Sequence, residues 1–324
     1  MLTPSDAVND SELVIISGLT ARPVTRCHLG HSAAPLHVWD KDGFGYYRCP
    51  QCGLLWVSPQ LTDESVAQIY SSGFKSKHAT RPRPANFLAY RPRLQRLAHY
   101  RSTGRLLDVG CFTGHFLLAA QAAGWAQVEG TEISTPAVEY ARAQYGLTVH
   151  EGDLTTLNLP HDHYDAVTLS DVIEHVRDPL ATIQQVHRIL RPGGVLYIDT
   201  PHVTSLPYAL YKQAWSVFFP WHRTYFSARN MRLALEQSGY RVRYLAAVGV
   251  LPFNRHNAWE AYQASSSVQP RVSGLKSKSF IQRYRDVLRP AWLAVKWAHE
   301  FPFHLLSRAG IHVGAKLIVY AEKR

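Results

Sequence analysis

Apolar and polar positions follow two periods along the chain, and the most regular pattern lies between residues 105 and 250. Short apolar runs there alternate with longer segments in which apolar residues recur every three or four positions. The short runs predict buried strands, and the longer segments predict amphipathic helices. The predicted strands are Arg105–Val109, Gln127–Thr131, Thr148–His150, Tyr164–Leu169 and Val195–Asp199, and the predicted helices are Phe116–Ala123, Pro136–Tyr145 and Pro179–Leu190.

Alternating strands and helices predict an α/β fold with a doubly wound, Rossmann-like parallel sheet. Ligands of such sheets bind at the carboxyl ends of the strands. The rest of the chain divides around this core of residues 105–250. Residues 1–60 predict a small strand-rich lobe, 61–104 a helical basic connector, 251–314 a helical insertion or cap, and 315–324 a strand that closes the core sheet.

The charge distribution leaves the choice of partner open. The formal net charge is +11, and residues 65–107 hold nine Lys and Arg but no Asp or Glu, while a second basic stretch covers residues 271–324. Such fields attract phosphates on nucleic acid, on a nucleotide-linked substrate or on a membrane, but a solvated basic face is an equal alternative. No apolar run reaches the ~20 residues of a membrane span. The first residues lack the pattern of a secretory signal, so we expect a cytoplasmic protein.

Acidic residues follow successive predicted strands in an order that suits one ligand. Asp108 precedes a turn in which Gly110 and Gly114 let the backbone approach a ligand, and the helix that follows offers free N–H groups. Glu132 ends the second strand, where a carboxylate can accept hydrogen bonds from ribose hydroxyls. Asp153 follows the third strand, where an acid can accept one from an adenine amine.

This order, with the segment Ser170–Val176 after the fourth strand and Leu190–Gly194 before the fifth, resembles the class I S-adenosylmethionine-dependent methyltransferases. The resemblance covers residues 105–250 and the closing strand, and it implies S-adenosylmethionine (SAM) as the cofactor. Phe112 departs from the family pattern, because it replaces the central glycine of the loop. The residues that the resemblance assigns to the cofactor are Asp108, Gly110, Cys111, Gly114, Glu132, Asp153, Leu154 and Ser170.

Asp171, Glu174 and His175 share one face of a helical turn beside the expected cofactor pocket. Three hypotheses remain open for them. The side chains could fix the loop by hydrogen bonds, or His175, with Asp171, could act as a general base toward the acceptor. In the third hypothesis all three hold a divalent metal, because the segment resembles quinone-biosynthesis O-methyltransferases, which bind a metal through Glu-x-x-Glu-His.

A second candidate metal site lies in the N-terminal lobe. Cys49 and Cys52 have zinc-knuckle spacing, and in a reduced compartment paired thiols are more often metal ligands than disulfides. With Cys27 and His31 they complete a four-ligand structural zinc site, for which His28 or His37 could replace His31. Methyltransferases of sugar and glycan pathways carry a similar N-terminal ribbon. The alternative is a ribbon that has lost its metal.

The acceptor side is the least specified part of the sequence. An aromatic segment follows the fifth strand, and Trp221 and His222 are our candidate acceptor contacts. Residues 291–298 and 304–306 could form an amphipathic surface with basic flanks, which would suit a lipid-linked acceptor or peripheral membrane contact, with a helical cap over the pocket as the alternative. The pattern predicts no oligomeric state.

The leading functional hypothesis is methyl transfer to a small-molecule, sugar, glycan or lipid-linked acceptor. A nucleic-acid (RNA) methyltransferase is the alternative that the charge and the ribbon favour. The segment after the fourth strand lacks the Asn/Asp-Pro-Pro-aromatic motif of amino-methylating enzymes, which argues against it. A non-catalytic SAM-binding scaffold is the third possibility, and the intact acidic series argues against it.

Overall fold

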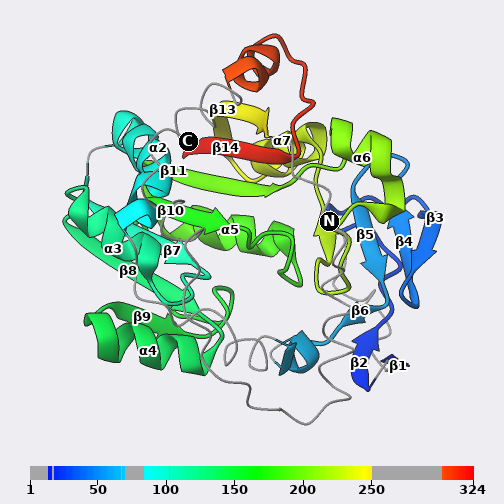
Figure 1. Ribbon diagram of the computed structural model, residues 1–324, viewed down its shortest axis with the longest axis horizontal. Coiled ribbons are helices and arrows are strands. Elements are labelled where there is room, and N and C mark those ends of the chain that lie inside the picture. Colours follow the sequence, from blue (N-terminus) through cyan, green and yellow to red (C-terminus); the bar gives the residue numbers. More distant parts are fainter. Residues whose placement is uncertain (1–13, 17, 67, 70–83, 102, 250–300) are drawn as a thin grey trace, which may run out of the picture.

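The computed structural model describes residues 14–16, 18–66, 68–69, 84–101, 103–249 and 301–324, which form one large sheet with flanking helices and two smaller sheets (Figure 1). The strands of the large sheet are β7 (Arg105–Val109), β8 (Gln127–Glu132), β9 (Thr148–Glu151), β10 (Tyr164–Ser170), β11 (Leu190–Pro201), β13 (Tyr240–Val248) and β14 (Lys316–Lys323). The helices are α2 (Pro84–Tyr100), α3 (His115–Ala122), α4 (Thr135–Tyr145), α5 (Pro179–Ile189), α6 (Leu206–Tyr211) and α7 (Ala228–Gln237), with a 3-10 turn η1 (Lys212–Ala214).

The large sheet has the strand order β13-β14-β11-β10-β7-β8-β9. Neighbouring strands from β11 to β9 are parallel, and β14 runs antiparallel to both β11 and β13. The order reverses at β7, so the carboxyl ends of β7 and β10 flank the switch point where ligands of doubly wound sheets bind. The predicted fold class is therefore confirmed, and the last described strand, β14, lies between β11 and β13.

Side chains alternate between the two faces of the large sheet, as the period of a strand requires. On β7, Leu107 packs with helices α5 and α7, whereas Leu106 packs with α2, α3 and α4. Leu196 and Tyr197 of β11 divide between the two faces in the same way. Both faces are thus covered by helices, which leaves the strand ends as the open edge of the core.

The N-terminal part folds into two small sheets that pack against the core (Figure 1). The strands that the N-terminal part contributes are β1 (Val14–Ile16), β2 (Leu19–Arg22), β3 (Leu36–Lys41), β4 (Phe44–Arg48), β5 (Leu55–Ser58) and β6 (Gln60–Leu61). A further strand, β12 (Thr224–Tyr225), comes from much later in the sequence. Because β12 pairs antiparallel with β5, the lobe's sheet includes a strand that follows the fifth strand of the core. Trp56 and Leu54 of the lobe belong to the same apolar cluster as the α5 side of the core.

Most of the predicted insertion lies outside the described residues. Of residues 251–314, the structure describes only 301–314, of which 301–308 are helical. Of the two segments behind the hypothesis of membrane contact, residues 291–298 lie outside the described part, whereas residues 304–306 lie in the described helix, where Leu305 and Leu306 are exposed. Among the helices that the structure describes, none is both long and apolar enough to span a bilayer.

Candidate functional site

The loop between β7 and α3 is anchored to the neighbouring strand by its backbone. The N–H groups of Gly110 and Cys111 both donate to the carbonyl of Thr131, at 2.8 and 3.0 Å. Gly110 has φ +68°, and an added Cβ would lie 2.8 Å from a methyl group of Val172. Only glycine therefore fits this position, and the loop passes close to the segment after β10.

Phe112 and Glu132 are coupled in this loop. Phe112 adopts φ +49°, a left-handed conformation that costs a non-glycine residue free energy and that occurs often at functional sites. Its N–H donates to one carboxylate oxygen of Glu132 at 2.9 Å, and the N–H of Ser134 donates to the other at 2.9 Å. These bonds hold the carboxylate at the end of β8 and still leave lone pairs on both oxygens.

Asp108 lies at the carboxyl end of β7, fully enclosed. The Thr168 hydroxyl on β10 donates to its Oδ1 at 2.5 Å. Burial raises the pKa of Asp108 to about 7, although this hydrogen bond and the nearby Arg93 oppose the shift. The predicted acid at this position is thus present, and it ties two central strands together.

The side chains of three other predicted cofactor residues differ in their exposure to solvent. The Cys111 thiol is buried against Gly130, where an added Cβ would lie 2.4 Å from its Sγ, and it donates to the carbonyl of Phe112 in the loop at 3.8 Å. Asp153 is exposed, and its Oδ1 accepts from the N–H and hydroxyl of Thr155. The Leu154 side chain is buried in the core cluster, so its predicted stacking on adenine would require it to move.

A buried ionic network joins the ends of β10, β11 and β14 to α2. Ser170 donates to Oδ2 of Asp199 at 2.9 Å, and Arg93 donates to both residues, at 2.9 and 2.8 Å. Lys316 lies 2.7 Å from Oδ1 of the same carboxylate. Burial would raise the pKa of Asp199, but the two cations outweigh it and lower the pKa to about 2. Ser170, predicted to bind the cofactor, is thus held by this network.

Asp171 is directed to this network and not to its predicted metal partners. Its Oδ2 accepts from Lys316 at 2.7 Å, and its N–H donates to Asp199. Asp171 also adopts φ +52°. It therefore lies outside the group that Glu174 and His175 form, because a lysine from the closing strand holds its carboxylate.

His222 takes the third place in that group. Ligand atoms of Glu174, His175 and His222 all lie within 4.8 Å of one another, and the two imidazole rings meet edge to face with centroids 4.5 Å apart. Thr200 donates to one oxygen of Glu174 at 3.0 Å. The other oxygen of Glu174 and Nδ1 of His222 are buried without a hydrogen-bond partner among the residues described.

Burial dominates the electrostatics of this group. It raises the pKa of Glu174 to about 8, with a further contribution from the charge of Asp171. It lowers the pKa of His175 to about 4 and that of His222 well below its ordinary value. Both imidazoles are therefore neutral at pH 7, which is the form that binds metals. The carbonyl of Trp221 accepts from Nδ1 of His175 at 3.0 Å, so Nε2 of His175 carries the lone pair.

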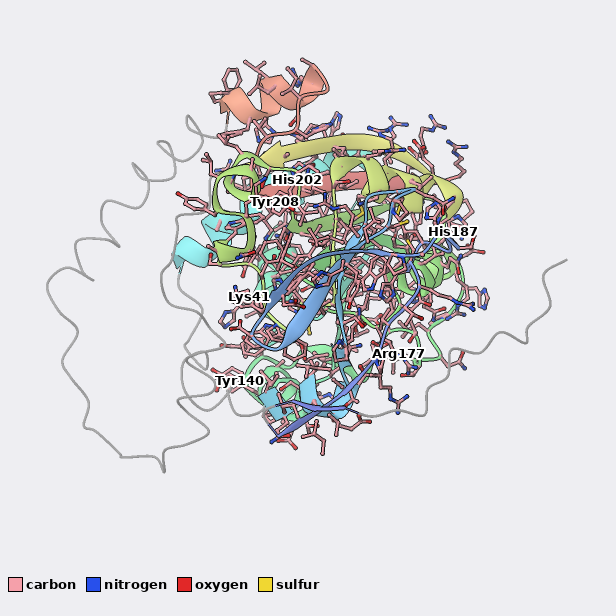
Figure 2. The ribbon with its side chains drawn as sticks, turned by 90° about the vertical axis from the view of Figure 1, so that its right-hand side faces the viewer. Lys41, Tyr140, Arg177, His187, His202 and Tyr208 are labelled. Atoms are coloured by element: carbon pink, nitrogen blue, oxygen red, sulfur yellow. The ribbon has the colours of Figure 1, made fainter. Side chains whose placement is uncertain are left out.

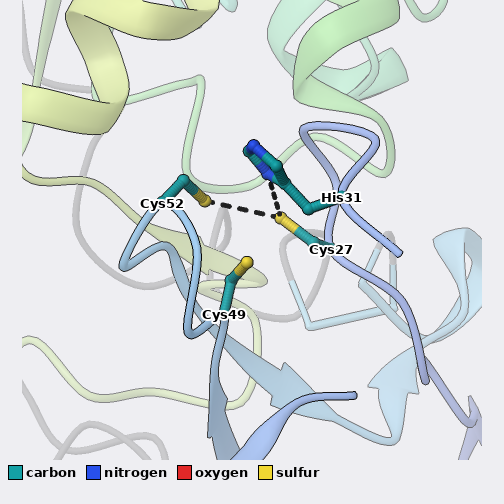
Figure 3. A group of neighbouring side chains, drawn as sticks. All are labelled: Cys27, His31, Cys49 and Cys52. Carbon is teal, nitrogen blue, oxygen red and sulfur yellow. Dashed lines mark hydrogen bonds between the residues drawn. The ribbon is translucent and has the colours of Figure 1, made fainter. Parts of the chain in front are cut away.

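The N-terminal lobe brings its predicted metal ligands together (Figure 3). The Sγ atom of Cys27 lies 3.6 Å from Sγ of Cys52 and 3.6 Å from Nδ1 of His31, and Cys49 completes a group whose atoms all lie within 4.8 Å. Tetrahedral zinc with bonds of about 2.0–2.3 Å requires ligand separations of roughly 3.5–3.8 Å. The two alternatives for His31 are engaged elsewhere, His28 with Gln60 and His37 with Asp40.

The sequence of the chain matches a known protein family. A family profile described as a methyltransferase domain matches residues 83–245, which is half of the chain. The chain belongs to this methyltransferase family. The resemblance to class I SAM-dependent methyltransferases is thereby confirmed, and the matched range includes α2, the cofactor loop and the Glu174–His175 segment.

Individual relatives of this methyltransferase match it over part of their length. A protein of Haemophilus ducreyi named ubiquinone biosynthesis O-methyltransferase is 33% identical over 150 residues, which are 43% of this chain and 61% of that protein. One of the same name from Actinobacillus pleuropneumoniae is 33% identical over 116 residues, 33% of this chain and 49% of that protein. A solved SAM-dependent methyltransferase of Archaeoglobus fulgidus covers 79% of this chain and 99% of its own, with 19% identity and a TM-score of 0.47.

Three residues of the methyltransferase's site were not predicted as such from the sequence. Arg93 and Lys316 hold Asp199 and Asp171, and each lies in a basic stretch without a local motif. His222 was predicted as an acceptor contact but not as a partner of Glu174. The sequence signal for His222 was its position among aromatic residues after the fifth strand. This signal does not indicate which residue His222 contacts.

Proposed function

We propose that this chain transfers the methyl group of SAM to a hydroxyl group of a small-molecule or sugar acceptor. The observation that carries the proposal is the group formed by buried Glu174 and His222 with half-buried His175, at the edge of the sheet where the cofactor loop lies. The names of the matched relatives, ubiquinone biosynthesis O-methyltransferases, support an oxygen acceptor. Because the chain overlaps those relatives only in part, we do not extend their quinone acceptor to it.

The residues around the cofactor loop fit SAM. Gly110 and Gly114 provide positive-φ backbone where a ligand can approach, and the carboxylate of Glu132 keeps lone pairs for the ribose hydroxyls. Asp108 and Ser170 would face the methionine part, and Asp153 with the backbone of Leu154 the adenine. Glu132→Gln should weaken SAM binding at least about tenfold by calorimetry, and Glu139→Gln, an exposed acid on α4, should not change it.

The group of Glu174, His175 and His222 fits a divalent metal. A carboxylate and two neutral imidazoles form a suitable donor set, and two of the ligand atoms are buried without a partner among the described residues. When bound, such an ion would lower the pKa of an acceptor hydroxyl by Lewis-acid action. His222 would then be the third ligand, in the place that the sequence predicted for Asp171.

The protein's own groups would then position the acceptor and remove its proton. The acceptor oxygen forms a bond to the methyl carbon as the carbon–sulfur bond breaks, and the hydroxyl proton must leave. Nδ1 of His175 donates to the carbonyl of Trp221, so its other nitrogen, Nε2, can serve either as the metal ligand or, without a metal, as the base, but not as both. With a pKa of about 4, His175 passes the proton readily to solvent but is a weak base. This weakness is why the proposal includes a metal.

Labelled cofactor tests both parts of the proposal. An extract is supplied with methyl-labelled SAM and the chain, with EDTA, and with EDTA followed by excess Mg²⁺. We expect label in a low-molecular-weight or glycan fraction, loss of labelling in EDTA and recovery with Mg²⁺. Nuclease-sensitive label would favour the RNA alternative, and full labelling in EDTA would remove the metal. No labelling in any fraction, with intact SAM binding, would favour the scaffold alternative.

We further propose a structural zinc ion held by Cys27, His31, Cys49 and Cys52. The separations of the ligand atoms and the burial of all three thiols support it. The pKa of Cys27 is lowered, chiefly by the hydrogen bond from Cys52, toward the thiolate form that binds zinc. Elemental analysis should find about one zinc per chain, and a value well below that would contradict the site.

A further inference from the structure

A cavity of about 470 Å³ lies between the N-terminal lobe and the methyltransferase core. The lobe contributes residues 22–28 and 60–64 to its wall, and the core contributes Arg177, Asp178 and Arg223. Figure 2 shows Arg177 at the side of the molecule where the lobe meets the core. The volume lies in the range of small-molecule sites. No residue assigned to SAM lines it.

The wall of this cavity is rich in arginine. Arg22, Arg26, Arg177 and Arg223 line it, against Asp63, Glu64 and Asp178. Two of these acids already have hydrogen-bond or ion-pair partners within the protein. Asp63 lies 2.5 Å from Arg223, and Asp178 caps helix α5 by accepting from the N–H of Ala181 at 2.9 Å. The four guanidinium groups thus outnumber the three carboxylates by one.

Arg223 supplies an independent sign of a ligand. Its side chain is 3% exposed, yet its one carboxylate partner, Asp63, is 66% exposed. Nη2 donates to the carbonyl of Leu61, while Nε is buried with no hydrogen-bond partner in the part of the chain that the structure describes. A buried guanidinium with an unused donor is unfavourable unless an acceptor reaches it. A ligand with several acceptor oxygens would meet this need.

The cavity adjoins the proposed reaction centre. The backbone N–H of Arg223 donates to the carbonyl of Glu174 at 2.7 Å, and Arg177 follows His175 by two positions. Gln60 bridges the lobe and the core at the wall, because its amide donates to the carbonyl of Arg223 and to His28. A group bound in the cavity would thus contact the same segment that carries the Glu174 group.

We propose that this cavity binds a phosphate or diphosphate group of the acceptor, so that the substrate class is a phosphorylated or nucleotide-linked small molecule. Guanidinium groups bind phosphate oxygens through paired, charge-assisted hydrogen bonds, and four of them line one small cavity. A neutral quinone ring has carbonyl acceptors but no negatively charged oxygens to pair with a guanidinium group. This inference rests on the proposed methyl transfer, and it names the part of the acceptor that the lobe helps to hold.

Calorimetry on the full chain tests the proposal with inorganic pyrophosphate, uridine diphosphate and glucose 1-phosphate as probes. The variants are Arg26→Gln and Arg177→Gln, both at exposed residues where we expect the fold to be kept, and the matched control is Arg241→Gln, at an exposed position on β13. We expect at least one probe to bind, and each cavity variant to weaken it about tenfold or more. The control should stay within about twofold. Arg223 is avoided because it is buried.

Each outcome decides the proposal. Binding of pyrophosphate and uridine diphosphate assigns a nucleotide-linked acceptor, and binding of glucose 1-phosphate alone assigns a sugar phosphate. The absence of binding of all three probes at about 10 mM, or equal affinity in the double cavity variant, overturns it. SAM is titrated into the same samples. If SAM binds and the probes do not, this inference fails alone, whereas failure of SAM to bind refutes the proposed function.

Discussion

Two groups of metal-ligand side chains in this methyltransferase differ in composition and in how the chain assembles them. The lobe group has three thiols and an imidazole, four ligands on two tight turns. The core group has a carboxylate and two imidazoles, of which His222 lies 47 positions beyond His175. The first has enough ligands for a tetrahedral ion, while the second offers three ligands.

In the proposed function, this difference would match the distinction between structural and catalytic metal sites. A closed set of four soft ligands stabilises a small lobe that has little core of its own, because binding free energy becomes folding free energy. A set of three ligands leaves a coordination position for an acceptor oxygen. Loss of a ligand should therefore reduce stability in the lobe and turnover in the core.

The largest effect is expected from Cys52→Ala. Without one thiolate the lobe should lose its zinc, from about one ion per chain to below about 0.2, and the fold should lose at least about 3 kcal/mol. That loss corresponds to a Tm lowered by roughly 6–12 °C. Elemental analysis and thermal unfolding measure the two quantities.

Cys111→Ala is the matched control, because Cys111 is also a buried thiol but lies outside the lobe group. It should keep the full zinc content and lower the Tm by only a few degrees. If both variants lost the same stability and neither changed the zinc content, the lobe would be held by packing alone and the contrast between the groups would fail.

Glu174→Gln should have the opposite effect to Cys52→Ala, because it should reduce turnover and not stability. The amide keeps the shape of the side chain but removes the anionic ligand, so turnover should fall by about 100-fold or more. SAM affinity should stay within about twofold. The Tm at pH 9 should be equal or higher, because burial raises the pKa of this carboxyl to about 8 and the ionised form destabilises the metal-free fold.

The sign of this pH effect can be tested in EDTA. A carboxyl with a raised pKa favours the fold below its unfolded pKa of about 4.3 and loses that contribution as pH rises through about 8. The Tm of the unsubstituted chain should therefore fall relative to Glu174→Gln between pH 5 and 9. Glu236→Gln, a surface acid on α7, should follow the unsubstituted chain. A pH-independent difference would show that Glu174 is not enclosed as described.

The parts of this molecule that the sequence predicted well are those with local causes. The strand Arg105–Val109 has the predicted bounds, and the other core elements shared with the prediction begin or end within a few residues of it. The greatest difference is β11, which begins at Leu190 and not at Val195, because it continues through the Pro192–Gly194 turn with an irregular register against β10. Apolar periods, helix caps and Cys-x-x-Cys spacing act over a few residues, so a single sequence carries them.

The parts that were missed depend on contacts between distant segments. The strand β12 has two residues and no period of its own, and it exists because β5 offers it an edge. Lys316 reaches Asp171 across 145 positions, and the i, i+3, i+4 spacing that placed Asp171 beside Glu174 and His175 gives no sign of this contact. Such pairs follow from the strand order of the sheet, which places the closing strand beside β11.

The smallest effect, and the sharpest test of the ligand set, is expected from Asp171→Asn. Asparagine tolerates the left-handed φ of +52° as aspartate does, so the backbone should keep its path. If His222 is the third ligand, Mn²⁺ affinity measured by calorimetry should change less than about threefold in this variant, while His222→Ala should lower it at least about tenfold. Equal losses in the two variants would place Asp171 among the ligands after all. Lys316 would then have to release Asp171 when the metal binds, and the core group would be a four-ligand site like that of the lobe.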